Sequence, residues 1–133
     1  MDAAEREARL TLAQQLRESA DHSSEQALRD SLSRSYYSIF HVGCALLGKG
    51  FGDHKQFLRD LKSKVGDALG RKVEELQNLR IQADYEFDAV RNRYGGEFAE
   101  FRRKARDVLK LGEEAYLELR SLLDEESRHE GNG

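Results

Sequence analysis

With 133 residues, no proline and no tryptophan, the chain is long enough to bury one core, and its many Glu, Arg, Leu and Ala residues are typical of long helices. Charged residues make up 35% of it, but the formal net charge is only −3, which argues against non-specific nucleic-acid binding through the whole surface. The single cysteine, Cys44, excludes an internal disulfide, and the sequence shows neither the roughly 18-residue apolar run of a membrane span nor a secretory signal. We therefore expect a soluble cytoplasmic protein.

The first two predicted helices are separated by the break D-H-S-S. The first covers about residues 3–20 and carries alanine and leucine at helical spacing. Ser23 with Gln26 three residues later matches a capping box, so the second helix is expected from about residue 24. It runs to about Leu47, where G-K-G-F-G ends it, because glycine tolerates the left-handed backbone found at helix C-termini.

Two shorter helices are predicted in the middle of the chain. Asp53 with Gln56 repeats the capping pattern and opens the third helix, whose end is left open by the glycines at 66 and 70. The fourth helix covers about residues 71–83, with an apolar residue every three or four positions. The following stretch, E-F-D-A-V-R-N-R-Y-G-G, breaks this pattern and predicts a connecting loop.

The last predicted helix has the clearest amphipathic pattern, with apolar residues at alternating spacings of three and four from Phe98 to Leu122. About 27 residues at 1.5 Å each would make a rod of roughly 40 Å. Two long helices with shorter ones beside them predict an all-α fold, an antiparallel up-and-down bundle of four to five helices. We expect one domain over residues 1–125 and a disordered acidic, glycine-rich tail over residues 126–133.

The second helix holds the segment S-R-S-Y-Y-S-I-F-H, residues 33–41. At 100° per residue, Arg34 and His41 differ by about 20° and lie two turns apart, opposite the main apolar face. Tyr37 and Asp30 lie near the same line, at about −60° and −40° from Arg34. Two interpretations remain open: an exposed polar strip, or, because aromatic and small residues flank the line, a partly buried cleft or subunit interface.

The chemistry available to this arginine and histidine is transesterification of RNA without a metal ion. Histidine titrates near neutrality and can move a proton to or from the 2′-hydroxyl or the leaving oxygen. Arginine stays charged and can hold a phosphate through its planar fork, stabilising the phosphorane. One histidine supplies one proton-transfer group at a time, so a complete site needs a second, which a two-fold dimer would provide.

A second candidate group lies in L-R-I-Q-A-D-Y, residues 79–85. Arg80 falls inside the apolar stripe of the fourth helix, and a buried arginine requires a partner, for which Asp84 and Asp30 are candidates. A salt bridge that locks the helix end is the favoured interpretation, and a contribution to the site is the alternative. The basic residues between 91 and 110 are interpreted as a solvated helix face, with a local basic patch as the alternative.

The sequence predicts no metal or cofactor site. Its four histidines lie in different segments, and neither H-x-x-x-H nor C-x-x-C occurs. There is no G-x-G-x-x-G or Walker loop, and G-K-G-F-G follows a helix rather than a strand. Cys44 lies three residues from His41 in apolar company and is expected to be a small apolar residue of a helix.

Two segments are similar to a known family. S-R-S-Y-Y-S-I-F-H-V-G-C-A-L-L resembles the S-R-x-Y-Y-x-x-F-H-x-x-x-A-L-L core of the HEPN (higher eukaryotes and prokaryotes nucleotide-binding) domain family. L-R-I-Q-A-D-Y resembles the second signature of the same Tyr-Tyr subgroup. The supporting or substrate-binding candidates are Tyr37, Asp30, Arg80, Asp84 and Tyr85. The resemblance covers about residues 8–123 and implies a bundle of four or five helices that forms a two-fold dimer.

For function, the resemblance implies a metal-independent endoribonuclease whose motif is an arginine followed after four to six residues by a histidine, here Arg34 and His41. The implied products carry a 2′,3′-cyclic phosphate and a 5′-hydroxyl, and the motifs of the two protomers meet across the dimer interface. Many such proteins are toxins paired with a small nucleotidyltransferase antitoxin, or defence or stress effectors. We expect RNA or a nucleotide, a second protomer and such an antitoxin as partners, with no cofactor and no membrane.

The chain departs from the family pattern at two positions. Gly43 replaces the tyrosine that accepts AMP in one branch, so this regulation is not expected here. His54 is followed by Lys55 and Gln56 rather than by serine and glycine, which leaves its role unassigned. The rival hypotheses are a non-catalytic HEPN module that binds a nucleotide or a nucleotidyltransferase partner, and a structural four-helix adaptor.

Overall fold

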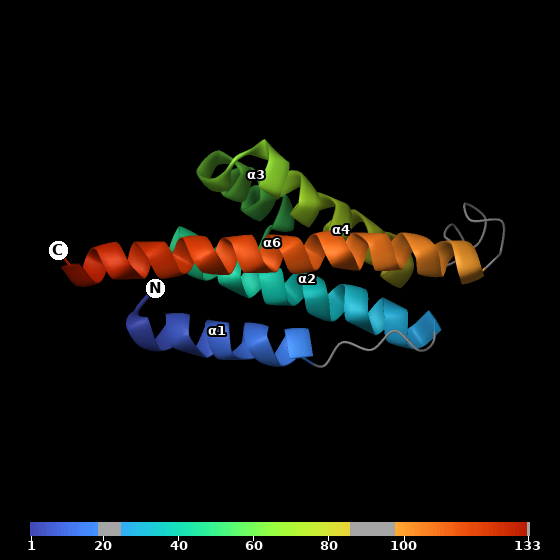
Figure 1. Ribbon diagram of the computed structural model, residues 1–133, viewed down its shortest axis with the longest axis horizontal. Coiled ribbons are helices and arrows are strands. Elements are labelled where there is room, and N and C mark those ends of the chain that lie inside the picture. Colours follow the sequence, from blue (N-terminus) through green and yellow to red (C-terminus); the bar gives the residue numbers. More distant parts are fainter. Residues whose placement is uncertain (19–24, 86–97, 133) are drawn as a thin grey trace.

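The computed structural model describes residues 1–18, 25–85 and 98–132, and every regular element in these ranges is an α-helix. Along the chain, the longer helices alternate in direction, and the short third helix packs on the second and fourth (Figure 1). The all-α prediction is confirmed, and the packed helices are α1 (Ala3–Glu18), α2 (Glu25–Leu47), α3 (His54–Val65), α4 (Asp67–Tyr85) and α6 (Phe98–Asn132).

Helix α2 is the centre of the bundle, because α1, α3, α4 and α6 all pack against it. Its predicted apolar face is buried, with Leu32, Tyr36 and Ile39 at most 1% exposed. On the side that faces α1, the hydroxyl of Ser38 is also buried and donates a hydrogen bond to the carbonyl oxygen of Ala13 at 2.8 Å. Because four helices cover α2, only part of its surface remains accessible for a functional site.

The start of α3 agrees with the capping prediction in part. The carboxylate of Asp53 accepts a hydrogen bond from the backbone N–H of Lys55 at 2.9 Å and so satisfies one of the unpaired donors of the first turn. The side chain of Gln56 donates to Asp60 at 2.6 Å, along the helix rather than back to the cap. The other predicted capping residue, Ser23, and the predicted loop at 86–96 lie outside the described residues.

Helix α4 begins at Asp67, four residues before its predicted start. A single residue, Gly66, separates α4 from α3. Gly66 has a φ of +96°, which lets the chain turn sharply between the two helices. The same turn is closed by hydrogen bonds from Gly66 N to Lys62 O at 2.8 Å and from Gly70 N to Gly66 O at 3.1 Å. The third helix therefore ends before the first of the two glycines, and Leu69 between them is a buried residue of α4.

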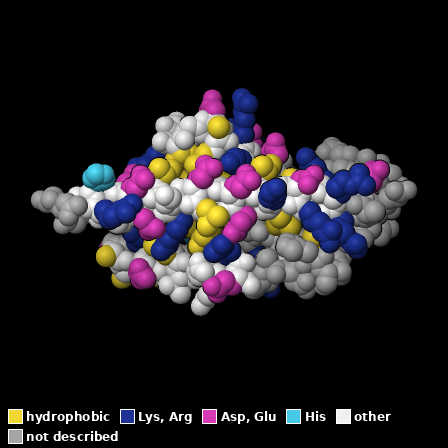
Figure 2. All heavy atoms as spheres, in the orientation of Figure 1, with side chains coloured by type: hydrophobic (Ala, Val, Ile, Leu, Met, Phe, Trp, Pro, Cys, Tyr) yellow, Lys and Arg dark blue, Asp and Glu magenta, His cyan; other side chains and the backbone are white. Residues whose placement is uncertain are grey.

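Helix α6 is longer than predicted and is helical as far as Asn132, whereas the sequence predicts a disordered tail from residue 126. The segment E-E-S-R-H-E contains no helix breaker, and Glu126 pairs with Lys64 of α3 at 3.0 Å. Acidic and basic side chains follow its exposed side, and apolar side chains show on either side of this charged row (Figure 2). Within the described ranges, no helix has an apolar run long enough to cross a bilayer.

Replacing Gly43 with alanine is expected to destabilise the fold by about 1–3 kcal/mol, because the added methyl group overpacks the core. A Cβ at this position would lie 2.6 Å from Cζ of the fully buried Phe57. This cost outweighs the gain of about 1 kcal/mol in helix propensity. Urea unfolding measures the difference in free energy of unfolding between the variant and the wild type. In the Gly43→Ala/Phe57→Leu variant the smaller side chain at position 57 makes room for the methyl group, so part of the lost stability should be recovered. A single variant as stable as the wild type would contradict the prediction.

Candidate functional site

The predicted Arg34–His41 line lies on the part of α2 that the other helices leave accessible. Arg34 and Asp30 are exposed, and Tyr37 and His41 are half-buried. The line is therefore neither wholly solvent-exposed nor enclosed. The exposed strip describes the arginine end of the line, and His41 at the other end is half-buried.

Helix α1 brings an arginine to His41. Arg9 Nη1 lies 3.0 Å from His41 Nδ1. A guanidinium group can only donate, so Nδ1 must accept, and the proton of the neutral imidazole lies on Nε2. Burial, with the positive charge of Arg9 as a second cause, holds the pKa of His41 below its ordinary value. His41 is therefore neutral near pH 7 and held in one tautomer.

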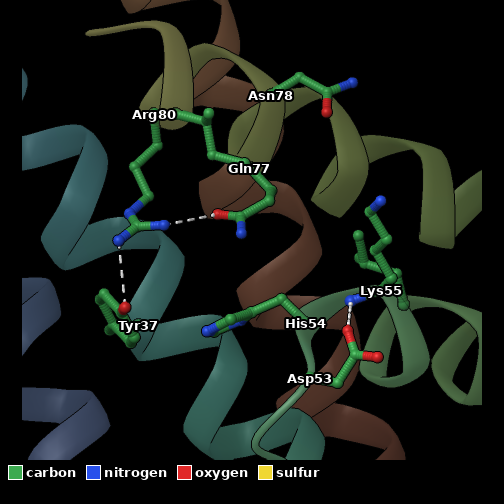
Figure 3. A pocket seen from close by; sticks show the side chains of 9 residues that line it. Tyr37, Asp53, His54, Lys55, Gln77, Asn78 and Arg80 are labelled. Atoms are coloured by element: carbon green, nitrogen blue, oxygen red, sulfur yellow. Dashed lines mark hydrogen bonds between the residues drawn. The ribbon is translucent and has the colours of Figure 1, made fainter. Parts of the chain in front are cut away.

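A second polar group lies on the other side of Tyr37, in an open pocket of about 660 Å³ between α2, α3 and α4. Arg80 lines it and is only 7% exposed. Its guanidinium donates to the hydroxyl of Tyr37 at 3.1 Å and to the side-chain oxygen of Gln77 at 3.2 Å (Figure 3). It also lies 4.8 Å from the centre of the Tyr37 ring, within cation–π distance. The sequence correctly predicts that Arg80 is buried.

His54 lines the same pocket, and its ring points towards Tyr37 in Figure 3. Its Nδ1 lies 2.6 Å from the hydroxyl of Tyr36, which orients the ring and leaves Nε2 for other contacts. Burial raises the pKa of Tyr36, so this phenol keeps its proton at any physiological pH. Burial, and then the charge of Arg80, lower the pKa of His54, which makes it neutral near pH 7.

The two histidines are connected through one aromatic ring. Phe40 lies 5.5 Å from the ring centre of His41 and 5.0 Å from that of His54. His41 itself is not among the residues that line the pocket, and neither is Arg34. The structure therefore places the candidate residues in two adjacent groups, the Arg34–His41 line with Arg9, and the pocket with Tyr37, Arg80 and His54.

Some predicted site residues lie elsewhere or outside the described part of the chain. The side chains of Asp84 and Tyr85, and all of residues 91 and 93, lie outside it. The basic residues that it does describe between 102 and 110 lie on α6, and no residue of α6 lines the pocket among the described side chains. The alternative interpretation of this run as a local basic patch therefore gains no support from the described lining of the pocket.

Cys44 is buried, in agreement with its predicted role as an apolar residue of the helix. Burial raises the pKa of its thiol to about 11. A nucleophilic cysteine requires the thiolate, which this environment disfavours. The histidine three residues away is engaged with Arg9 instead.

Arg9 and His54 are the two functional candidates that the sequence alone does not assign. Arg9 is one of several charged residues on a short amphipathic helix, and no spacing pattern relates it to a histidine 32 positions later. For His54, the signal available is its position directly after a helix-capping aspartate, which fixes its place at the start of α3.

Comparison of the chain with protein-family models, curated proteins and solved structures finds no match.

Replacing Arg9 with methionine is expected to raise the pKa of His41, because it removes a neighbouring positive charge and frees Nδ1 to accept a proton. Histidine NMR across a pH titration measures both the pKa and the tautomer. In the wild type, the neutral ring should carry its proton on Nε2. A wild-type ring protonated on Nδ1, or an unchanged pKa in the variant, would contradict this assignment. The signals of His54 serve as the internal control.

Proposed function

We propose that this chain is a HEPN-type, metal-independent endoribonuclease in which His41 moves the proton and Arg34 holds the phosphate. The observation that carries the proposal is the contact between Arg9 and a half-buried, neutral His41, on the same line of α2 as Arg34. One guanidinium group touches the imidazole, and a second lies two helical turns away. Cationic donors beside a neutral imidazole suit a reaction in which negative charge builds up on a phosphate.

In the proposed reaction, His41 takes the proton of a ribose 2′-hydroxyl, and the 2′-oxygen attacks the adjacent phosphorus. The bond from phosphorus to the 5′-oxygen breaks, and this oxygen leaves as a hydroxyl after receiving a proton. The products are a 2′,3′-cyclic phosphate and a 5′-hydroxyl. Nε2 can act as the base only in the other tautomer, so Arg9 must leave Nδ1. A bound phosphate would attract Arg9 and release the ring for catalysis.

The reaction needs two proton transfers, and a two-fold dimer would provide a second His41, which would have to enter the reaction as the imidazolium in order to protonate the leaving oxygen. The accessible part of α2 is the surface through which such a dimer would form. The proposed setting is the cytoplasm, where the chain would be the toxin of a pair and a small nucleotidyltransferase its antitoxin.

One observation favours the alternative, a non-catalytic HEPN module that binds a nucleotide or a nucleotidyltransferase partner. The described residues form a pocket of about 660 Å³ beside Tyr37, and it is lined by His54 and Arg80 rather than by Arg34 and His41. A module of this kind would use the pocket and leave RNA intact.

The test is incubation of the purified protein with several structured and unstructured RNAs in excess EDTA, followed by analysis of the product ends. Cleavage is expected to continue in EDTA and to leave 2′,3′-cyclic phosphate and 5′-hydroxyl ends. Cleavage that EDTA stops, products with 5′-phosphate ends, or intact RNA throughout would refute the enzymatic proposal. Intact RNA would favour the binding module.

A further inference from the structure

We propose that α1 is a gate on the Arg34–His41 site: it undocks from α2 as a unit while the rest of the bundle stays folded, and its docked position, with Arg9 on His41, is the inhibited state. The inference rests on the proposed function and adds the regulation of that same site. The undocking itself can be measured without RNA, so it can be tested separately from the enzymatic activity.

The face of α1 that packs on α2 buries little apolar surface. Helix α1 lies at the edge of the bundle (Figure 1), and of its 16 residues, all of them described, Ala13 is the one that is buried. The half-buried positions beside it include three arginines, Arg6, Arg9 and Arg17. Helix α6, by comparison, buries hydrophobic residues along its length from Phe101 to Leu123. Elements that bury little apolar surface open at a lower free energy than the whole domain, so α1 is the helix expected to leave first.

Polar contacts hold α1 in register on the bundle. The hydroxyl of Ser38 donates to the carbonyl oxygen of Ala13 at 2.8 Å. Arg17 Nε donates to the two carboxylate oxygens of Glu113 on α6 at 3.0 and 3.1 Å, and these two side chains are 34% and 45% exposed. Water can replace such contacts when the helix leaves, so they add little to the free energy of docking. The seam therefore fixes where α1 lies without fastening it strongly.

In the docked state, neither nitrogen of the His41 ring can accept a proton. Arg9 Nη1 lies 3.0 Å from Nδ1, which therefore accepts a hydrogen bond, and Nε2 of the neutral ring carries the proton. A base in this tautomer with its one lone pair occupied cannot take the proton of a 2′-hydroxyl. Removal of Arg9 frees Nδ1 and lets the ring change tautomer. The docked position of α1 is therefore inhibitory for the proposed reaction.

The surroundings of Arg9 couple the release of His41 to the movement of the helix. A Cβ built on Gly50, in the turn after α2, would lie 2.9 Å from Nη2 of Arg9. The guanidinium is thus close to the backbone of this turn while another of its nitrogens contacts His41. This leaves it little room to swing aside as long as α1 stays docked. Arg9 is therefore expected to leave the ring together with α1.

The undocking is tested by hydrogen exchange of the whole wild-type chain without RNA. The amides of α1 should exchange as a group, at least about 100-fold faster than the slowest amides of α2 and α6. Glu113→Arg repels Arg17 and should accelerate the exchange of α1 further, whereas Arg17→Glu/Glu113→Arg restores the pair with opposite polarity and should reverse that gain. Equal protection of α1 and α2 in the wild type would show that α1 leaves only on global unfolding and would overturn the proposal.

The coupling to the site is tested by Ala13→Phe, which places a large side chain in the fully buried centre of the seam and pushes α1 away from α2. Burial and the charge of Arg9 hold the pKa of His41 below its ordinary value, so loss of both should raise this pKa in a histidine NMR titration. The matched control is Leu12→Phe, which adds the same ring one position away at a 40% exposed residue and should leave His41 unchanged. An unchanged pKa and tautomer of His41 in Ala13→Phe would overturn the gate.

The inhibitory role is tested by single-turnover RNA cleavage in EDTA. Ala13→Phe should cleave at least about twofold faster than the wild type, because the ring no longer has to be released first, and Leu12→Phe should match the wild type. Equal or slower cleavage by Ala13→Phe would overturn the inhibition. If neither protein cleaves RNA, the proposed function fails and the inhibitory role with it, while hydrogen exchange and the histidine signals still decide whether α1 undocks.

Discussion

Replacing His41 with alanine is expected to reduce RNA cleavage by about 100- to 10,000-fold, the usual contribution of a positioned acid–base group. The imidazole is the proposed proton-transfer group, and its neighbour Arg9, at 3.0 Å in the free protein, cannot accept a proton in its place. Because His41 is only half-buried, the fold should tolerate the change. Single-turnover cleavage of one RNA in EDTA measures the cleavage rate, and far-UV circular dichroism of the variant checks that it is folded.

The matched control is His129→Ala, which removes an exposed histidine from α6. It should cleave RNA at the wild-type rate. If His41→Ala also keeps that rate, the observed activity belongs either to another group of the chain or to a contaminating nuclease, and the assignment of His41 fails.

Replacing Phe57 with alanine is expected to lower the free energy of unfolding by about 3–5 kcal/mol, because it leaves a cavity in the core. Phe57 is fully buried, and its ring centre lies 4.9 Å from that of Phe40 and 5.6 Å from that of Phe51. Domains are typically stabilised by about 5–15 kcal/mol, so this loss would remove a large part of the free energy of unfolding. Urea titration of the intrinsic tyrosine fluorescence measures the change.

The comparison for Phe57 is Phe51→Ala, because the two rings touch but Phe51 is only half-buried. Its removal should cost clearly less, since water can reach the vacated space. Since Phe40 packs on Phe57 and also contacts both His41 and His54, only Phe57→Ala should shift the NMR signals of both histidines. Equal destabilisation by the two variants would contradict the packing order described here.

The sequence predicts the parts of this fold that depend on neighbours in the chain. The apolar spacing of α2 predicts one buried face, which in the structure includes Leu32, Tyr36 and Ile39, and Asp53 correctly predicts the start of α3. The burial of Arg80 follows from its position in the same kind of stripe. These signals are local, because side chains three or four residues apart share a face whatever the tertiary structure.

The features that the sequence does not predict depend on contacts between distant residues. Nothing near position 9 indicates that Arg9 selects the tautomer of His41, and His54 reaches Tyr36 only because α3 folds back on α2. The early start of α4 depends on how Gly66 turns in three dimensions. Propensity and periodicity describe one element at a time, so a site built from α1, α2, α3 and α4 is visible only in the folded chain.

The proposed transesterification is tested most directly by a change in the substrate. One ribose at a mapped cleavage position is replaced with 2′-deoxyribose, and the modified RNA is incubated with the wild-type protein in EDTA beside the all-ribose strand. If His41 activates the 2′-hydroxyl, cleavage at the modified position should disappear while cleavage at neighbouring positions continues. Cleavage at the 2′-deoxy position, or an all-ribose strand that stays intact, would contradict the proposed function.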